Sequence, residues 1–426
     1  PTADGSSGQL LSTDGNGTLS WMSSSSGTTV DGLSDAKSGG DHFIGSLILG
    51  HATTGTLNNA LGNTAVGYAA LDAITSGDYN TALGSTVLSS NTSGNQNSAI
   101  GYNALSANTT GDYNQAIGVS ALAANTTGYR NLAIGKDALD AADEENDNLA
   151  IGYAALGGAI AGGEYNVAIG NYSLDANTSG DYNVAVGYDG LTANTSGASN
   201  TAMGYGALKA NTTGYYNIAI GTGAYDGADI EHNNLAIGYD ALGGAIDDGT
   251  YNVAIGNYSL DANTTGDYGT GVGYNALTSN TTGQRNTVIG AGALATNTTG
   301  NYNTASGYEA LTSNTTGNGN TASGYEALKD ANRTADTDGY NTALGYQAGN
   351  TGTNDVTTGN KNTLLGASSA ASAAAGTNQT VIGYGATGQA NNSVTLGNAD
   401  VTAVYMAQDA GATVYAAGLS LGGVAV

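Results

Sequence analysis

A recurring segment of this chain reads, at residues 251–266, Tyr251-Asn252-Val253-Ala254-Ile255-Gly256-Asn257-Tyr258-Ser259-Leu260-Asp261-Ala262-Asn263-Thr264-Thr265-Gly266. Lightly altered copies of it follow one another along most of the sequence. Each copy has Asn-x-Ala-(apolar)-Gly, then a short piece that ends in Leu, then Asn-Thr-Thr-Gly or a variant. Such an internal repeat indicates an array of stacked units, each of which contacts its neighbours in sequence.

The repeat length is measured on the glycine that follows the apolar residue, which we call the index glycine. Index glycines recur every 17 residues, except for steps of 18 before Gly170 and Gly256 and looser spacing after Gly324. Residues 148–187 and 234–273 are near copies offset by 86, so the array grew partly by duplication of five-unit blocks. A unit of this length is too short for a helical-hairpin repeat.

The residue pattern within one unit predicts β-structure. Val253 and Ile255 fall on one face of a short strand and Ala254 on the other. Gly256 ends this strand, residues 258–260 are predicted to form a second one, and Asn-Thr-Thr-Gly supplies a turn. The sequence therefore predicts an all-β fold, a parallel β-solenoid (β-roll) of 17-residue coils.

The alanine two residues before most index glycines indicates a close approach, either by the opposite side of the coil or by a neighbouring chain. One coil offers one large aliphatic residue beside the glycine, one Leu and otherwise small residues, which is a thin core for an isolated chain. We therefore expect several chains to associate along the axis and to bury the alanine face.

An asparagine four residues before the index glycine forms the most regular polar column. Stacked coils would let each amide bond its copy about 4.8 Å away. We therefore predict a structural ladder, with a polar binding row as the alternative. Its members are Asn63, Asn80, Asn97, Asn114, Asn131, Asn148, Asn166, Asn183, Asn200, Asn217, Asn234 and Asn252.

Three segments are predicted. Residues 1–45 read as an N-terminal hairpin, anchored by Trp21, and a linker, because Asp-Gly and Asn-Gly turn signals separate short apolar pieces. Residues 46–397 form the solenoid array. Residues 398–426 read as a strand-rich C-terminal cap, with strands at 401–406 and 412–415, because an array needs protected ends.

Composition limits the function classes. The chain has 426 residues and a formal net charge of −26, from 34 acidic against 8 basic residues. This charge opposes binding to nucleic acid or anionic membranes. No run of about 18 apolar residues is present to insert into a membrane, and without cysteine there is no disulfide framework. No signal peptide is visible, and the start at Pro1 indicates processing or an upstream beginning.

Catalytic and metal chemistry have little support. His42, His51 and His232 lie far apart in the array, and no nucleophile sits beside a base, so we predict no enzyme and no cofactor. Polysaccharide cleavage by carboxylates is the remaining enzymatic alternative. The turns lack the calcium-binding Gly-Gly-x-Gly-x-Asp pattern. Acidic turns at 143–147 and at Asp229 and Glu231 are predicted to be solvated, with an ion site as the alternative.

The candidate receptor-binding residues are Tyr308, Glu309, Tyr325 and Glu326, which repeat on adjacent coils. In-register stacking would bring the two carboxylates to about 4.8 Å, which costs energy unless they are solvated or bridged. Two tyrosine faces beside them could grip a sugar ring.

Two other polar patterns have competing explanations. Asn-Thr-Thr and Asn-Thr-Ser match the N-glycosylation pattern, but turn chemistry explains them without sugar. These asparagines are Asn91, Asn108, Asn125, Asn177, Asn194, Asn211, Asn263, Asn280, Asn297 and Asn314. Ice binding needs a regular threonine column, and the sequence offers an interrupted one at Thr64, Thr81, Thr201, Thr270, Thr287, Thr304 and Thr321.

Asn-Val-Ala-Ile-Gly, at 166–170 and 252–256, resembles the repeat of YadA-like heads of trimeric autotransporter adhesins. The longer form at 303–317 resembles phage tail fibres and related surface fibres, as do residues 1–21 and 393–422. This resemblance implies a left-handed homotrimeric β-roll located outside the cell, on a virion tail or a cell surface. Its expected function is a phage tail fibre or spike that attaches to a host glycan or protein receptor. The alternative is a bacterial or archaeal adhesin or matrix fibre.

Overall fold

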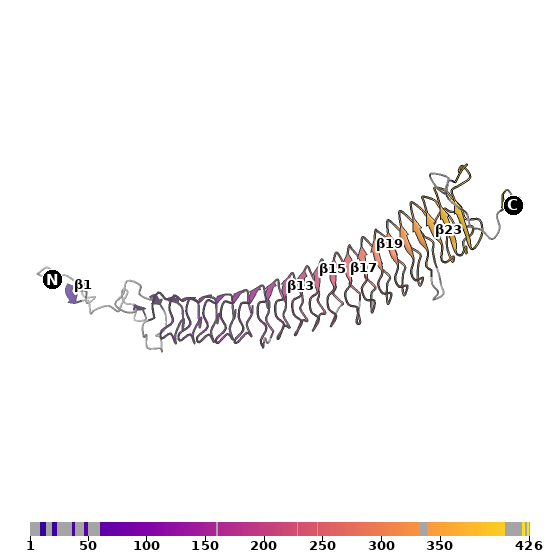
Figure 1. The fold of residues 1–426 in the computed structure, drawn as a ribbon. Helices are drawn as coiled ribbons and strands as arrows, with labels where there is room; N and C mark the ends of the chain where they lie inside the picture. Colours follow the sequence, from indigo (N-terminus) through magenta and orange to yellow (C-terminus); the bar gives the residue numbers. More distant parts are fainter. Residues whose placement is uncertain are drawn as a thin grey trace, which may run out of the picture. The chain divides into compact units, whose positions relative to one another are not determined.

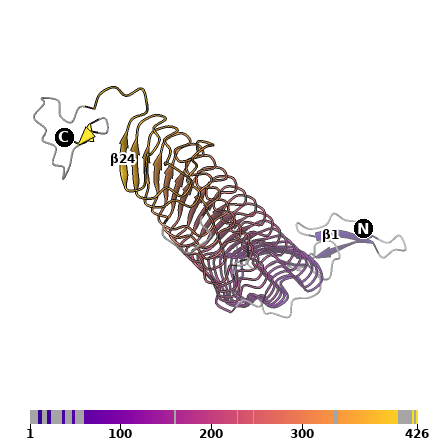
Figure 2. The same ribbon diagram turned by 90° about the vertical axis from the view of Figure 1, so that its right-hand side faces the viewer.

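The computed structural model describes residues 60–404 except 159, 160, 228, 245 and 333–338, together with the strand segments before 50 and after 419. The chain divides into two compact units, unit 1 (Pro1–Tyr268) and unit 2 (Gly269–Val426). Both units are built of stacked coils, each of which carries one short strand (Figures 1 and 2). The prediction of an all-β parallel solenoid is confirmed.

In unit 1, strands β4 to β16 form one parallel ladder in which equivalent residues of successive coils pair. The strands are β4 (Leu47–Leu49), β5 (Thr64–Val66), β6 (Thr81–Leu83), β7 (Ser98–Ile100), β8 (Gln115–Ile117), β9 (Leu132–Ile134), β10 (Leu149–Ile151), β11 (Val167–Ile169), β12 (Val184–Val186), β13 (Thr201–Met203), β14 (Ile218–Ile220), β15 (Leu235–Ile237) and β16 (Val253–Ile255). Before them, β3 (Ala36–Ser38) pairs antiparallel with β4.

In unit 2, strands β17 to β24 form a second parallel ladder. They are β17 (Thr270–Val272), β18 (Thr287–Ile289), β19 (Thr304–Ser306), β20 (Thr321–Ser323), β21 (Thr342–Leu344), β22 (Thr363–Leu365), β23 (Gln379–Ile382) and β24 (Ser393–Leu396). Thr321, Thr342 and Thr363 still pair in register although their coils are 21 residues long. The extra residues are therefore accommodated outside the strands.

The terminal predictions have mixed outcomes. β1 (Gln9–Thr13) and β2 (Leu19–Ser23) pair antiparallel, as a hairpin requires, whereas the linker and the Trp21 side chain lie outside the described residues. The predicted strand at 401–406 is wrong over 401–404, which have no regular structure. Residues 405–419, including the predicted strand at 412–415, lie outside the described part. β25 (Ser420–Leu421) and β26 (Val424–Ala425) pair antiparallel.

In the described part of the array each coil has one strand rather than two, so the predicted strand at 258–260 is wrong. Tyr258 and Leu260 have φ angles of 58° and 53°, in the left-handed region. Alternate residues in this region curl the backbone and prevent an extended strand. We call this segment, which lies between the index glycine and the turn asparagine of each coil, the curled leg. It still forms hydrogen bonds to the next coil, for example from Leu105 N–H to the carbonyl oxygen of Ala121 at 3.0 Å.

The index glycine is required where the strand turns into the curled leg. Gly67 has a φ of +136°, a conformation that side chains disfavour. A Cβ atom at this position would lie 2.0 Å from the carbonyl oxygen of Gly84, the next index glycine. Glycine is therefore needed both for its conformation and for the contact between coils.

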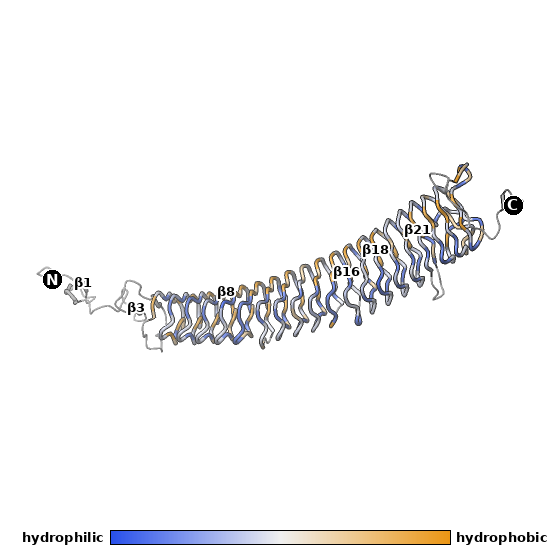
Figure 3. Tube along the Cα trace, viewed as in Figure 1, coloured by the Kyte–Doolittle hydropathy of each residue, from blue (hydrophilic) through white to orange (hydrophobic). Residues whose placement is uncertain are grey.

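The core of each coil is small. The strand turns its alanine into this core and its larger aliphatic residues outward, which is the reverse of our expectation. In the coil of β12, Ala185 and Leu191 are fully buried, whereas Val184 and Val186 are partly exposed. The alanines are enclosed within their own chain, because the leucine of the curled leg fills the rest of the narrow interior. The expectation that chain association buries the alanine face is therefore wrong. The larger aliphatic residues point outward, and hydrophobic segments recur from coil to coil (Figure 3).

The predicted asparagines do form a buried ladder. Asn183 Oδ1 accepts from the backbone N–H of Asn200 at 3.0 Å, and its Nδ2 donates to the carbonyl oxygen of Gly197 at 2.8 Å. One side chain therefore holds two backbone groups of the next coil. The N–H···Oδ1 contact joins every successive pair from Asn63 to Asn252.

Candidate recognition surface

The four candidate receptor-binding residues lie together on unit 2. Tyr308 and Tyr325 directly follow the index glycines that end β19 and β20. Their rings stack at a centroid distance of 5.4 Å, and Tyr346 extends the column at 5.2 Å from Tyr325. The three tyrosines are 48%, 43% and 53% exposed. Unit 2 therefore presents a column of three stacked phenols.

A lysine bridges the two glutamates beside the column. The sequence analysis expected the two carboxylates to be either solvated or bridged. Lys329 Nζ lies 2.6 Å from Glu309 Oε2 and 2.8 Å from Glu326 Oε1. Gln347 Nε2 also donates to Glu326 at 2.8 Å. The hydrogen bonds from Lys329 hold the pKa of Glu309 and of Glu326 below the ordinary glutamate value.

This geometry changes how the column can meet a ligand. Stacked rings turn their faces toward one another, so a ligand meets mainly ring edges and hydroxyl groups, except at the two ends of the column. Sequence reasoning missed Lys329, Tyr346 and Gln347. Tyr346 could have been found, because it follows its index glycine as Tyr308 does. Lys329 could also have been found, three residues after Glu326.

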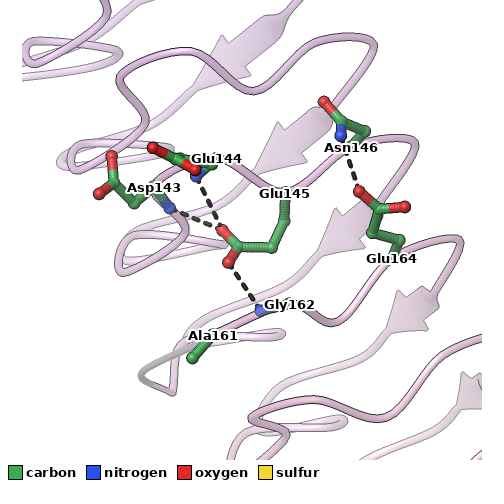
Figure 4. Close-up of a pocket in the computed structure, with 7 residues that line it drawn as sticks. All are labelled: Asp143, Glu144, Glu145, Asn146, Ala161, Gly162 and Glu164. Carbon is green, nitrogen blue, oxygen red and sulfur yellow. Dashed lines mark hydrogen bonds between the residues drawn. The ribbon is translucent and has the colours of Figure 1, made fainter.

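The acidic turn at 143–147 satisfies its own backbone. Glu145 is buried, and its Oε2 accepts from the N–H groups of Asp143 at 2.7 Å and Glu144 at 3.1 Å (Figure 4). Its Oε1 accepts from the N–H of Gly162 in the next coil at 2.9 Å. Glu231 makes the equivalent contacts 86 residues later. The prediction of solvated acidic turns is therefore confirmed at Asp143, Glu144 and Asp229, which are exposed, and is wrong at Glu145 and Glu231, which are buried.

These two glutamates compensate for the 18-residue coils that follow them. In regular coils, turn N–H groups donate to the next coil, as Thr92 and Ser93 do to the carbonyl oxygen of Thr109. In the turn at 143–145 the glutamate carboxylate accepts from the equivalent N–H groups instead. Glu145 occupies the position of the regular turn glycine, and the preceding turn asparagine is Ala142. Among the described residues, no group of acidic or histidine side chains is arranged to hold a metal.

The asparagines of the glycosylation patterns are fully buried. Asn108 Nδ2 donates to Asn91 Oδ1 at 2.8 Å and to the carbonyl oxygen of Gly111 at 3.1 Å. Attachment of a sugar to this nitrogen would replace one of its two hydrogens, so at least one of these bonds would be lost, and the buried turn would have to open to admit the sugar. The structure therefore favours turn chemistry over glycosylation at these positions.

The outer face of the strands differs between the units. We call the outward side chains of β5 to β16 the aliphatic face, because most of them are Val, Ile or Leu and none is charged. Leu83 and Ile117 on this face are 47% and 43% exposed. In unit 2 the first outward position is threonine in seven consecutive strands, from Thr270 through Thr342 and Thr363 to Thr380.

The remaining observations concern the whole chain. No helix in the described part is long and apolar enough to cross a bilayer. A comparison with known proteins finds no family model and no curated protein that matches this sequence.

Proposed function

We propose that this chain forms a homotrimeric extracellular fibre that attaches a phage tail or spike to a host-cell surface. The aliphatic face of unit 1 is the observation that carries this proposal. The second outward position of these strands is Val, Leu, Ile or Met in all twelve, and these side chains are exposed or partly exposed. One apolar row of this length is unusual on a monomeric protein and indicates an interaction site. The number of copies, three, is taken from the resemblance to trimeric β-rolls.

Charge supports association at this face. Each copy carries a net charge of −26, so copies repel one another over most of their surface. Strands β5 to β16 contain no Asp, Glu, Lys or Arg, so two copies can meet there without placing like charges together. A cellular adhesin or matrix fibre remains the alternative function, because it would use the same association and the same repeated weak contacts.

The association is tested by the mass of the native particle in analytical ultracentrifugation. We expect about three times the chain mass of 41.8 kDa. Lysine at Ile134, Ile151 and Ile169 should reduce it to one chain mass, because burying three charges per copy costs several kcal/mol each. A charge-matched control carries lysine at the exposed turn residues Thr110, Thr127 and Ser179 and should remain trimeric. A monomeric native chain would contradict the proposal.

Recognition is assigned to the phenol column of unit 2. Replacing Tyr308, Tyr325 and Tyr346 together by alanine should weaken binding to host cells by about tenfold or more, as expected for loss of aromatic anchors. The column is exposed, so the particle mass should not change. Unchanged cell binding would place the receptor site elsewhere without affecting the trimer.

A second candidate, adhesion to ice, is favoured by the in-register threonine column of unit 2. A regular row of hydroxyl and methyl groups at the strand spacing of about 4.8 Å can order water in a lattice-like row. The column is confined to seven strands of unit 2, and in unit 1 the same position is mostly occupied by other residues, so we place this function second. A freezing-point gap in the purified protein would support it, and freezing at the melting point would exclude it.

A further inference from the structure

Two pairs of tyrosines in unit 1 have almost parallel rings in close contact. Tyr165 stacks on Tyr182, and Tyr251 stacks on Tyr268, each at a centroid distance of 5.1 Å and an interplanar angle of 3°. The second pair is the copy of the first, 86 residues later. The four rings are 44%, 59%, 47% and 50% exposed, so reagents reach them from solvent.

The backbone holds these rings in place. Tyr165, Tyr182 and Tyr251 directly precede ladder asparagines, whereas Tyr268 precedes Gly269. All four tyrosines have a φ of 56° to 58°, so each side chain leaves its coil at the same angle. Beneath the first pair, the backbone N–H of Asn183 donates to Asn166 Oδ1 at 2.9 Å. The two phenols of the first pair therefore lie on neighbouring coils that a buried hydrogen bond holds in register.

We propose that these pairs are sites of oxidative cross-linking, in which Tyr165 joins Tyr182 and Tyr251 joins Tyr268 through a carbon–carbon bond. The oxidant would be hydrogen peroxide acting through a haem peroxidase. Each phenol loses one electron and one proton, and the two radicals couple at the ring carbons beside the hydroxyl groups. The ring hydrogens at those carbons then move to the oxygens, which restores both phenols. Peroxide accepts the two electrons and two protons and leaves as two water molecules.

These two pairs have a shorter centroid distance and more nearly parallel rings than three other tyrosine stacks in the described residues. Tyr188 and Tyr205 stack at 5.6 Å and 7°, and in the column of unit 2 the distances are 5.4 and 5.2 Å and the angles 13° and 8°. Edge-to-face neighbours differ more. Tyr172 contacts Tyr153 and Tyr188, but the ring planes are at 83° and 81°, so an edge meets a face. In a parallel stack, the carbons beside the two hydroxyl groups can face each other without a ring turning. Coupling should therefore be faster in the parallel pairs than at Tyr172, which is near Tyr182 in sequence.

A cross-link of this kind would have a structural consequence. The chain has 27 tyrosines and no cysteine, so no disulfide can join its coils. A bond between Tyr165 and Tyr182 would close a loop of one coil and prevent the two coils from separating when the chain unfolds. Unfolding of unit 1 should therefore become slower after oxidation.

The experiment treats the full-length chain with horseradish peroxidase and hydrogen peroxide and identifies cross-linked peptides by mass spectrometry. We expect the peptides that contain Tyr165 and Tyr182, and Tyr251 and Tyr268, to dominate. The Tyr182→Phe, Tyr268→Phe double variant keeps the stacked rings and removes two phenols, so the two proposed cross-linked peptides should disappear and the dityrosine fluorescence should fall. Tyr172→Phe is the matched control and should keep it.

Isotope labelling separates bonds within one chain from bonds between copies. Equal amounts of light and heavy chains are mixed, reassociated and then oxidised. Bonds within a chain join light to light and heavy to heavy, as the proposal requires. The proposal would be overturned by cross-links that join light to heavy chains. It would also be overturned by cross-links that are spread evenly over the exposed tyrosines, or that the double variant leaves unchanged.

Discussion

At the scale of the residue, the asparagine ladder shows how far sequence reasoning reaches. A column of identical asparagines predicts a ladder, and the structure has one. The same rule also locates Asn341, Asn362 and Gln379 in unit 2, each four residues before an index glycine. Sequence could not tell that the main partners are backbone groups of the next coil. That geometry depends on the curled leg, in which leucines adopt positive φ. No residue pattern in the sequence predicts positive φ at these leucines.

Asn183→Ala should destabilise unit 1 by about 2–6 kcal/mol. It leaves the N–H of Asn200 and the carbonyl of Gly197 buried without their partners, and each unmet group costs about 1–3 kcal/mol. Hydrogen exchange at the Asn200 amide measures the effect locally, which suits a repeat array that does not unfold in two states.

The matched control is Asn171→Ala. Asn171 Oδ1 also accepts a backbone N–H, that of Tyr153 at 2.9 Å, but this contact is exposed to solvent. Water can replace the lost acceptor, so the change should stay within about 0.5 kcal/mol. Equal effects of the two substitutions would show that burial of the ladder does not determine its contribution.

At the scale of the element, the sequence predicted the length of the coil and the position of its turns. It did not predict the conformation of the segment after the index glycine. The alternation around 258–260 fits a strand equally well as a leg of alternating left-handed residues. The buried face of the strand was also ambiguous. An alternation of period two separates two faces but does not indicate which of them points into the coil. The interior accepts alanine and one leucine, and the larger side chains must face outward. Sequence could not reveal this, because it depends on the width of the coil.

Glu145→Ala should open the junction between the regular coil and the 18-residue coil. Three backbone N–H groups, those of Asp143, Glu144 and Gly162, would lose their carboxylate acceptor. We expect a loss of about 3 kcal/mol or more, since hydrogen bonds to charged groups contribute about 1.5–3 kcal/mol each. Hydrogen exchange at these three amides should accelerate together. Glu144→Ala removes a neighbouring exposed carboxylate and should leave the exchange rates unchanged.

At the scale of the whole molecule, sequence predicted the repeat array and its acidity. Three-fold association and the receptor remain predictions, because each depends on a face whose partner is another molecule. The acidity has a further consequence that depends on the fold. Partial burial raises the pKa of Asp226 and of Asp261, and the nearby carboxylate of Asp240 raises both further. In unit 2 the pKa of Glu309 and of Glu326 is lowered instead.

The sign of the pH dependence in unit 1 follows from these shifts. A folded-state pKa above the ordinary value of 3.8 means that the folded chain binds protons more tightly than the unfolded chain. Stability therefore falls as pH rises through the window above 3.8, and it increases on mild acidification. The glutamates of unit 2 act oppositely, because their lowered pKa values add stability above the ordinary value of 4.5 that is lost on acidification.

Asp226→Asn together with Asp261→Asn should flatten the pH dependence of unit 1. The variant should be more stable than the native chain near pH 7, where both aspartates are charged, and this advantage should vanish as pH approaches about 4. Thermal unfolding at a series of pH values measures the difference. Neutralising the exposed acids Glu144 and Asp247 removes the same net charge without relieving burial. If this control produced the same flattening, general charge repulsion rather than the two half-buried carboxylates would account for the pH dependence.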